Sequence, residues 1–476
     1  MFKKSILFLS LISILTASSY EEWLKSQNSE YSTYKKSMDE EFSDMLKKDW
    51  EAFKAMSTPS PYIKPKPTDI PAVKEEVVLP KKEIIDSPKI KFKPIIKEKV
   101  IPAKVIPVVK KYHNFKTANF DFYGENISIQ YDKKISFNLG KINKTIISKY
   151  WDKVSNSDFK KLISQINKQS SNLSLNDWGK YQLIYKLGLK IYDNPNSANL
   201  FTWFVLVKNN FDTKVGYSKN NIYLLSTMKH SLYQIAFFNL NKKKYYILTP
   251  NGRVGKIGNV YTYSGDYPKA KKQLSFEIKK DIKLYQNIKQ KKLSFKYNNK
   301  TYDINTQYSQ ELVNFYKSFP QSDYNIYFST KNSPSLSNSL VKSLQPYIVG
   351  KSEIEAVNFL LRFTQKSFAY KTDQKQFDYE KVMFPEETIY YPYSDCEDRS
   401  IMFSYLVKSL LNLDVVGVKY QDHLATAVAF SSNISGDGFV YKNKKYTISD
   451  PTYINANSGM TMPTYKNSKF KIIALK

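Results

Sequence analysis

A cysteine, a histidine and an aspartate follow one another toward the end of the chain, each in its own local setting. Cys396 is the only cysteine among 476 residues, and His423 and Asp450 come after it. A thiol nucleophile, an imidazole base and a carboxylate that orients the base are the components of covalent acyl chemistry. The sequence therefore predicts a Cys396–His423–Asp450 catalytic triad.

The cysteine stands at the predicted start of a helix over residues 395–411. Ser394 or Asp395 fits the N-cap, and the apolar run 401–403 follows in the next turn. The N-terminal end of a helix dipole favours an anion, and His423 would add to that effect as ion-pair partner and base. Both effects predict a pKa for the thiol below its usual value of about 8.5.

Three carboxylates beside the cysteine oppose this effect. Asp395, Glu397 and Asp398 are its nearest acidic neighbours along the chain. Like charges disfavour a thiolate. We therefore expect these side chains to point away from the thiol, or to bond backbone N–H groups and Arg399.

The histidine and the aspartate lie on predicted neighbouring strands. Alternating residues indicate strands over 414–420, 424–430 and 445–449. His423 opens the second of these strands and Asp450 follows the third. Neighbouring antiparallel strands place such residues within a few ångströms of each other. The other two histidines lie elsewhere in the sequence, so His423 is the only candidate base near the cysteine.

Three segments carry a resemblance to a known family. They are DCEDRS over 395–400, DHLATAV over 422–428 and SDPT over 449–452. They resemble the bacterial transglutaminase-like (papain-like) cysteine peptidase superfamily across residues 346–465. The resemblance implies a core helix with the cysteine, packed on an antiparallel sheet with the histidine and aspartate. It also implies acyl chemistry on amides through a thioester.

The support residues of the site are less defined. The animal cross-linking enzymes of this superfamily use a tryptophan near the oxyanion, and no tryptophan follows Trp203 here. Tyr393 or Gln374 is the candidate donor beside the backbone N–H of the cysteine. Arg399 is either a structural ion-pair partner or a ligand for a substrate carboxylate, and Asp398 is a further support candidate. No His/Cys cluster supports a zinc site, and we predict no cofactor.

The N-terminus has the pattern of a secretory signal peptide. Lys3 and Lys4 precede the apolar run 6–15, and Ala17 and Ser19 fit a cleavage site. The run is too short to span a membrane, although an uncleaved amphipathic anchor is the alternative. We predict a signal peptide over residues 1–19 and a periplasmic or secreted bacterial protein with no membrane span after cleavage.

The charge of the chain comes almost wholly from lysine. The net charge is +30, and only three of the 73 basic residues are arginine. Abundant Lys, Asn, Ile and Tyr are typical of an AT-rich genome. A nucleic-acid partner is not expected, because such proteins use arginine for bidentate contacts. Association with anionic envelope polymers stays open as an accessory property.

Two segments precede the globular part. Residues 20–57 carry aromatic and Met residues at three- and four-residue steps, which predicts a charged amphipathic helix. This helix either binds a partner or a second copy of itself, or packs on the body of the protein. Residues 58–111 contain ten of the twenty prolines, which predicts an extended linker that spaces the helix from the globular part.

Two globular units follow, and their elements come in the same order. The first spans 112–270, and the second has a strand-rich part over 271–345 and a catalytic domain over 346–476. Aligned runs are 204–208 with 404–408, 232–238 with 424–430 and 244–250 with 445–451. The alignment places Asn196, Ser231 and Thr249 near the triad positions, and none of them supplies the triad chemistry. The glycine-rich run 251–258 is interpreted as a turn, because it lacks a Lys-Ser/Thr ending.

The predicted fold class is therefore α+β and transglutaminase-like, in tandem with a degenerate first copy and preceded by a helix and a Pro-rich linker. Two unrelated α/β units of similar composition are the alternative. The predicted function is an exported cysteine hydrolase, a peptidase or amidase acting on envelope protein or peptide. Acyl transfer to an amine, which would cross-link proteins, is the second enzymatic hypothesis. A binding scaffold with a vestigial triad is the non-enzymatic one.

Overall fold

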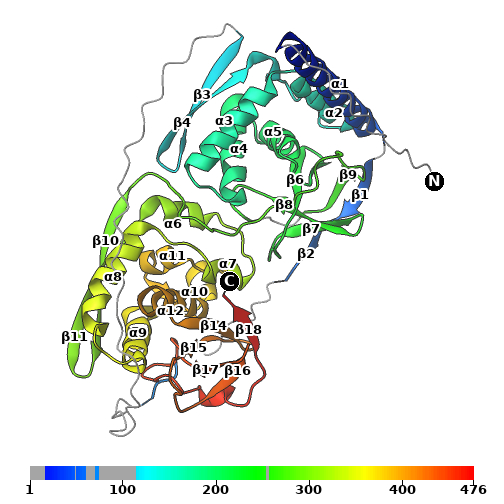
Figure 1. The fold of residues 1–476 in the computed structure, drawn as a ribbon. Helices are drawn as coiled ribbons and strands as arrows, with labels where there is room; N and C mark the ends of the chain where they lie inside the picture. Colours follow the sequence, from blue (N-terminus) through cyan, green and yellow to red (C-terminus); the bar gives the residue numbers. More distant parts are fainter. Residues whose placement is uncertain (1–16, 49, 60–69, 74–113, 254–256, 476) are drawn as a thin grey trace, which may run out of the picture.

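The computed structural model describes residues 17–48, 50–59, 70–73, 114–253 and 257–475. It is a mixed α+β structure whose two large sheets are antiparallel, each accompanied by helices (Figure 1). The apolar run of the predicted signal peptide and most of the predicted linker lie outside the described residues. Among the residues that the structure describes, no helix is long and apolar enough to cross a membrane.

The N-terminal helix is shorter than predicted. Helix α1 (Ala17–Lys47) ends ten residues before the predicted boundary, and the chain continues into strands β1 (Trp50–Lys54) and β2 (Met56–Ser57). Trp50 and Phe53, whose spacing suggested helix, are instead the partly buried residues of β1. Pairing with a distant strand overrides the local periodicity here, because a strand's hydrogen bonds are made outside its own segment.

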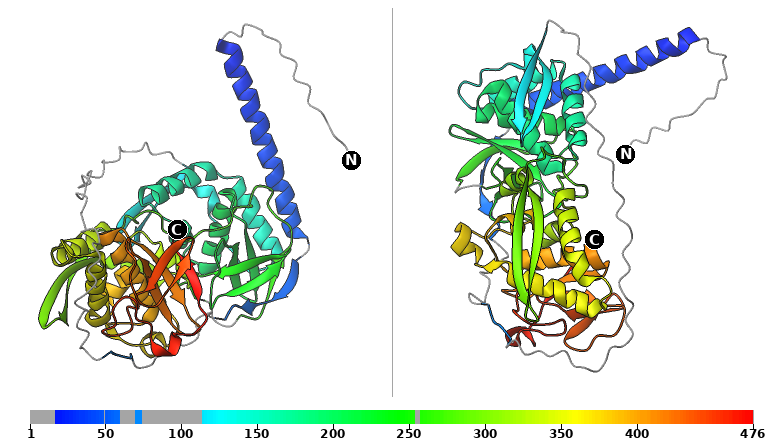
Figure 2. Two further views of the ribbon diagram at one scale, coloured as in Figure 1. Left: turned by 60° about the horizontal axis from the view of Figure 1, so that its bottom comes forward. Right: turned by 90° about the vertical axis from the view of Figure 1, so that its left-hand side faces the viewer.

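Helix α1 packs on the body through its C-terminal part. Met38, Phe42 and Leu46 are buried, and the Ser43 hydroxyl bonds Ser148 on the neighbouring helix α2 (Lys144–Ser155) at 2.9 Å. Figure 2 shows the N-terminal part of α1 projecting away from the rest of the molecule. The prediction that a linker spaces this helix from the globular part is therefore wrong.

The first unit combines a hairpin, four helices and a sheet. Its elements are β3 (Phe115–Phe122), β4 (Glu125–Asp132), η1 (Lys133–Ile135), α2 (Lys144–Ser155), α3 (Phe159–Asn172), α4 (Asp177–Tyr192), α5 (Pro195–Lys208), β5 (Thr213–Ser218), β6 (Asn221–Thr227), β7 (Ala236–Leu240), β8 (Lys243–Leu248) and β9 (Asn259–Tyr263). The sheet has the order β1-β9-β5-β6-β8-β7-β2. Its two edge strands, β1 and β2, are consecutive in sequence, so residues 50–57 run along both edges and belong to this unit.

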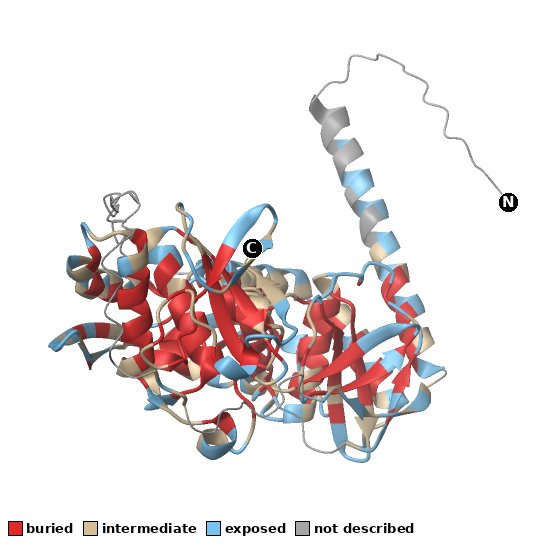
Figure 3. Ribbon diagram, turned by 90° about the horizontal axis from the view of Figure 1, so that it is seen from below, coloured by how far each residue is buried: buried red, intermediate tan, exposed pale blue. Residues whose placement is uncertain are grey.

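The second unit repeats the plan with more helices. Its elements are β10 (Ile288–Tyr297), β11 (Lys300–Ser309), α6 (Gln310–Lys317), α7 (Tyr324–Phe328), α8 (Pro334–Ile348), α9 (Glu353–Ser367), β12 (Ala369–Tyr370), α10 (Asp373–Phe377), α11 (Pro385–Tyr390), β13 (Tyr393–Ser394), α12 (Cys396–Leu411), β14 (Asp414–Lys419), β15 (Leu424–Ala429), β16 (Gly438–Tyr441), β17 (Lys444–Ile448), η2 (Pro463–Tyr465) and β18 (Lys471–Ala474). The sheet order is β16-β17-β15-β14-β18. Figure 3 shows that buried residues fill the interior of both units.

The two sheets share one strand order. When the edge strands β1 and β2 are left out, the strand order of the first sheet is β9-β5-β6-β8-β7. The strand order of the second sheet is β18-β14-β15-β17-β16. A helix directly precedes each sheet, α5 in the first unit and α12 in the second. The order matches β7 with β16 and β6 with β15. The predicted alignment of 232–238 with 424–430 is therefore displaced by one strand, since similar apolar runs occur on both.

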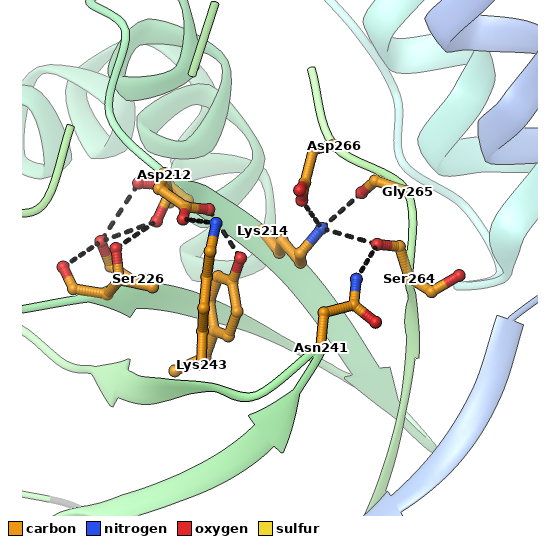
Figure 4. A network of polar contacts seen from close by, with 11 residues as sticks. Asp212, Lys214, Ser226, Asn241, Lys243, Ser264, Gly265 and Asp266 are labelled. Carbon is orange, nitrogen blue, oxygen red and sulfur yellow. Dashed lines mark hydrogen bonds and ion pairs between the residues drawn. The ribbon is translucent and has the colours of Figure 1, made fainter. Parts of the chain in front are cut away.

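A lysine–aspartate pair occupies the same place in both sheets. Lys243 at the start of β8 lies 2.8 Å from Asp212, just before β5, and Lys444 at the start of β17 lies 2.6 Å from Asp414 at the start of β14. Figure 4 shows the first pair beside buried Lys214, whose ammonium bonds Asp266 and two backbone carbonyls. Full pairing makes this polar network compatible with burial.

A described piece of the linker lies on the second unit. Ala72 forms a parallel bridge with Ile454, and the Val73 N–H donates to the Ile454 carbonyl at 3.0 Å. Asn455 Nδ2 donates to the Val73 carbonyl at 3.1 Å. The elements before this piece (α1, β1 and β2) and the element after it (β3) all belong to the first unit. The chain therefore leaves the first unit, contacts the second unit at residues 72–73 and returns to the first unit.

Candidate active site

The cysteine is the first residue of helix α12, as predicted. Asp395 is the N-cap residue, and the helix packs against α9, β14 and β15. Apolar side chains on several faces of α12 are buried, so the helix is enclosed within the unit. This enclosure fixes the position of Cys396, whose side chain is fully buried.

The structure brings His423 and Asp450 together. His423 lies in the turn before β15 and Asp450 follows β17, two strands that are neighbours in the sheet. His423 Nε2 and Asp450 Oδ2 are 2.8 Å apart, and both residues are buried. The second carboxylate oxygen of Asp450 accepts the Thr452 N–H at 2.8 Å. Asp450 therefore holds one ring nitrogen of the imidazole in a fixed direction.

The start of α12 lies against the residue that follows the histidine. The Ser400 hydroxyl donates to the Leu424 carbonyl at 2.8 Å, and the Leu424 N–H is directed at the Cys396 sulfur, which favours the thiolate. His423 Nδ1 is buried and has no hydrogen-bond partner within the described residues. Nδ1, the ring nitrogen that does not contact Asp450, is thus the one available to take a proton.

The thiol itself faces a carboxylate. Cys396 Sγ donates to Glu397 Oε2 at 2.8 Å, and the other oxygen of Glu397 accepts the Tyr324 hydroxyl at 3.2 Å. Burial, followed by the charges of Glu397 and Asp395, raises the pKa of the Cys396 thiol well above its ordinary value. The predicted lowering of this pKa is therefore wrong for the form described, and so is the expectation that Glu397 points away.

Asp398 behaves as expected for a residue of the first helical turn. Its oxygens accept the N–H groups of Met383 at 2.8 Å and Asp395 at 3.2 Å. Burial raises the pKa of Asp398 to about 7. The side chain is directed at backbone amides and not at the thiol, so its role is to hold the loop before α11 against α12.

Arg399 has a structural role that the sequence did not predict, since it binds backbone carbonyls. Its guanidinium is fully buried and donates to the Ser394 hydroxyl at 3.2 Å and to the carbonyls of Gln365 and Phe368. These carbonyls end helix α9, where cations are favourable. Burial lowers the pKa of Arg399 to about 10. Among the described residues the guanidinium therefore forms no ion pair with a carboxylate, and its donors are directed at Ser394 and at the end of α9.

The two predicted oxyanion donors lie elsewhere. Gln374 on α10 is exposed, and its amide donates to the carbonyl of Asp378 at the end of its own helix. Tyr393 is 36% exposed, and its ring lies under the Lys371 ammonium. In the described form neither side chain is held at the thiol, since Gln374 bonds the end of its own helix and Tyr393 contacts Lys371.

Other residues surround the triad instead. The Tyr465 ring stacks on the His423 ring at 5.0 Å, and its hydroxyl donates to Asp422 at 3.0 Å. Gln365 on α9 donates to the Asp450 carbonyl at 3.0 Å. Tyr370 on β12 interacts electrostatically with Cys396. No local signal marks these three residues, since their roles depend on elements far apart in sequence.

One group of carboxylates has spacing suited to a cation. Among the described residues, Asp373, Asp395 and Asp398 are the group whose oxygens come within 4.8 Å of one another. Burial and mutual repulsion raise the pKa values of Asp373 and Asp395 well above the ordinary range. Protons thus offset the crowding of these acids.

Comparison of the chain with family models, curated proteins and solved structures finds no match.

Proposed function

We propose that this protein is an exported cysteine hydrolase that cleaves peptide or protein amides through Cys396, His423 and Asp450. The observation that carries the proposal is the 2.8 Å contact between His423 Nε2 and Asp450 Oδ2. It lies beside the helix that presents the only cysteine of the chain, and it leaves the imidazole Nδ1 without a hydrogen bond among the described residues. Export rests on the signal-peptide pattern of residues 1–19.

In this mechanism the thiol proton passes from Cys396 to His423 Nδ1 and the sulfur attacks the amide carbonyl. Asp450 stabilises the charged imidazole through Nε2. The backbone N–H of Cys396, at the start of α12, stabilises the oxyanion. Collapse of the tetrahedral intermediate breaks the C–N bond, and His423 returns the proton to the leaving amine. Water then hydrolyses the thioester and restores the thiol.

The mechanism requires an opened form of the site. Cys396 and His423 are fully buried, and Tyr465 lies on the imidazole ring. We infer that the form described is a resting state and that Tyr465 moves before an amide reaches the sulfur. Lids that exclude water are common among enzymes that form reactive intermediates.

We also propose a transglutaminase-like fold in tandem, with a non-catalytic first copy. The shared strand order and the matched lysine–aspartate pairs support a duplication. By position, Pro195 begins α5 as Cys396 begins α12, and Asn220 precedes β6 as His423 precedes β15. Ser231 lies in the β6–β7 loop instead, where its N–H bonds Asp323. None of these residues supplies a thiol or an imidazole.

The burial of Cys396 and His423 favours a second candidate function, a binding scaffold that retains an inert triad. Acyl transfer uses the same thioester and differs only in its acceptor, an amine in place of water. The three functions predict different outcomes in one experiment.

The experiment is digestion of a defined peptide library by the purified mature protein, with new termini read by mass spectrometry. The hydrolase should produce new carboxyl and amino termini. Cys396→Ser and His423→Ala should abolish cleavage, and Asp450→Asn should slow it by about a hundredfold or more, because the imidazole loses its orienting charge.

His230→Ala is the matched control, because His230 lies in the first unit and bonds Ser275. It should leave cleavage unchanged. Incorporation of an added primary amine at glutamine would favour acyl transfer. Absence of any product, together with a Cys396 thiol that iodoacetamide modifies only after denaturation, would contradict both enzymatic functions and favour the scaffold.

A further inference from the structure

A cavity lies where the two units meet, away from the proposed triad. Its volume is about 190 Å³, and its walls come from the turn after β8, the end of α6 and the segment after α10. Every charged side chain that lines it is cationic: Arg253, Lys317 and Lys381. A small concave site with convergent charges of one sign is a candidate for a ligand of the opposite sign.

Arg253 is held in a geometry suited to an anion. Its guanidinium carbon lies 3.6 Å from the centre of the Tyr379 ring, so the cation is stacked on the aromatic face. Stacking leaves the N–H groups at the edge of the guanidinium directed sideways, where they can bind two oxygens of a carboxylate or phosphate. Arginine is rare in this chain, and only three of its residues are arginines.

The charges of the cavity are not cancelled by neighbouring acids. Lys381 is buried and bonds Glu387 at 2.7 Å, so this lysine is neutralised. Asp323, which contacts the wall residue Tyr233, accepts the Tyr233 hydroxyl and the Ser231 N–H. Within the described part of the chain, Arg253 and Lys317 have no carboxylate partner. Two positive charges therefore remain available to a ligand.

The two units meet closely at this point, so the cavity is a built feature. Gly252 has a φ of +66°, and a side chain there would lie 2.2 Å from the Ser318 carbonyl oxygen. Phe319 forms part of the wall, and Gln321 accepts the Val382 N–H at 2.8 Å. We propose that this cavity binds an anionic group, a carboxylate or a phosphate, between Arg253 and Lys317.

The experiment is isothermal titration of the full mature chain with inorganic phosphate and, separately, with succinate. The ionic strength is held at about 0.15 M, so that attraction to the many exposed lysines is screened. One saturable site is expected for at least one probe. The stronger of the two identifies the ligand as phosphate-like or carboxylate-like.

Arg253→Gln should weaken this binding at least tenfold, and Lys317→Gln should weaken it to a smaller extent. Arg253→Lys keeps the charge but loses the two-pronged contact, and should be intermediate. Lys296→Gln, on the exposed face of β10, is the matched control and should bind as the wild type does. Equal weakening in the control, or no saturable binding of either probe, would overturn the proposal.

Discussion

At the scale of residues, the chemistry around Cys396 is dominated by carboxylates. The thiol donates to Glu397, and Asp395 and Asp398 lie in the same turn of the helix. Burial raises the pKa of the Cys396 thiol, and the charges of Glu397 and Asp395 raise it further. The Leu424 N–H acts in the opposite direction, but within the described form its effect on the pKa does not prevail. The resting thiol is therefore protonated near neutral pH.

The first prediction concerns Glu397→Gln. Removing the carboxylate charge should lower the pKa of Cys396 and shift the midpoint of its reaction with iodoacetamide by about one pH unit or more toward acid. The raised pKa holds the thiol protonated at pH values where a free cysteine ionises, so the variant should gain reactivity between about pH 7 and 9. The measurement is the rate of alkylation against pH, followed by intact mass.

Glu355→Gln is the control for this prediction. Its carboxylate is exposed and bonds Ser352 at the start of α9, so the charge change is the same but does not face the thiol. An unchanged pH midpoint in Glu397→Gln would mean that burial alone controls the thiol. Such a result would leave the proposed hydrolase untouched, because that function depends on His423 and not on Glu397.

At the scale of elements, the N-terminal helix is fastened by an aromatic cluster. Phe42 is 4% exposed and makes edge contacts with Trp151 at 4.6 Å, Tyr267 at 5.3 Å and Tyr263 at 5.9 Å. These rings come from α2, β9 and the segment after β9, so a single side chain joins three parts of the first unit. Aromatic pairs of this kind contribute beyond their buried area.

Phe42→Ala should therefore lower the free energy of unfolding of the first unit by about 3–5 kcal/mol. Urea denaturation followed by tryptophan fluorescence measures this loss, since Trp151 and Trp203 lie at the same cluster. Tyr34→Ala on the same helix, where the side chain is 53% exposed, should change stability by less than about 0.5 kcal/mol. Equal effects of the two variants would show that α1 contributes through helix formation and not through this cluster.

At the scale of the whole molecule, the joint between the units rests on close backbone contact. Within the first unit, Gln182 of α4 holds the turn after β8 by donating to the Pro250 carbonyl, and Gly252 in that turn lies on the end of α6 in the second unit. The positive φ of Gly252 and its closeness to Ser318 both exclude a side chain.

Gly252→Ala should thus weaken the joint by about 1–3 kcal/mol and separate the unfolding of the two units into distinct calorimetric transitions. Gly258→Ala is the matched control, because a side chain there would meet nothing within 4 Å and its φ is not positive. A single unchanged transition in Gly252→Ala would indicate that the turn shifts without loss of the joint.

Local signals predicted the elements that position Cys396, His423 and Asp450. The expected helix over 395–411 is α12 (Cys396–Leu411), and the expected strands over 414–420, 424–430 and 445–449 correspond to β14, β15 and β17. A capping residue, an apolar run and strict alternation are properties of one segment, so the sequence alone determines these elements. Their order also led to the pairing of His423 with Asp450.

Tertiary structure decided what those elements face. The direction of Glu397 toward the thiol, the bonds of Arg399 to the end of α9 and the positions of Tyr465 and Gln365 all depend on contacts between distant segments. The same is true of β1 and β2, whose hydrogen bonds are made with β9 and β7. A sequence specifies local backbone preference residue by residue, whereas burial, side-chain direction and edge pairing exist only once the chain has packed.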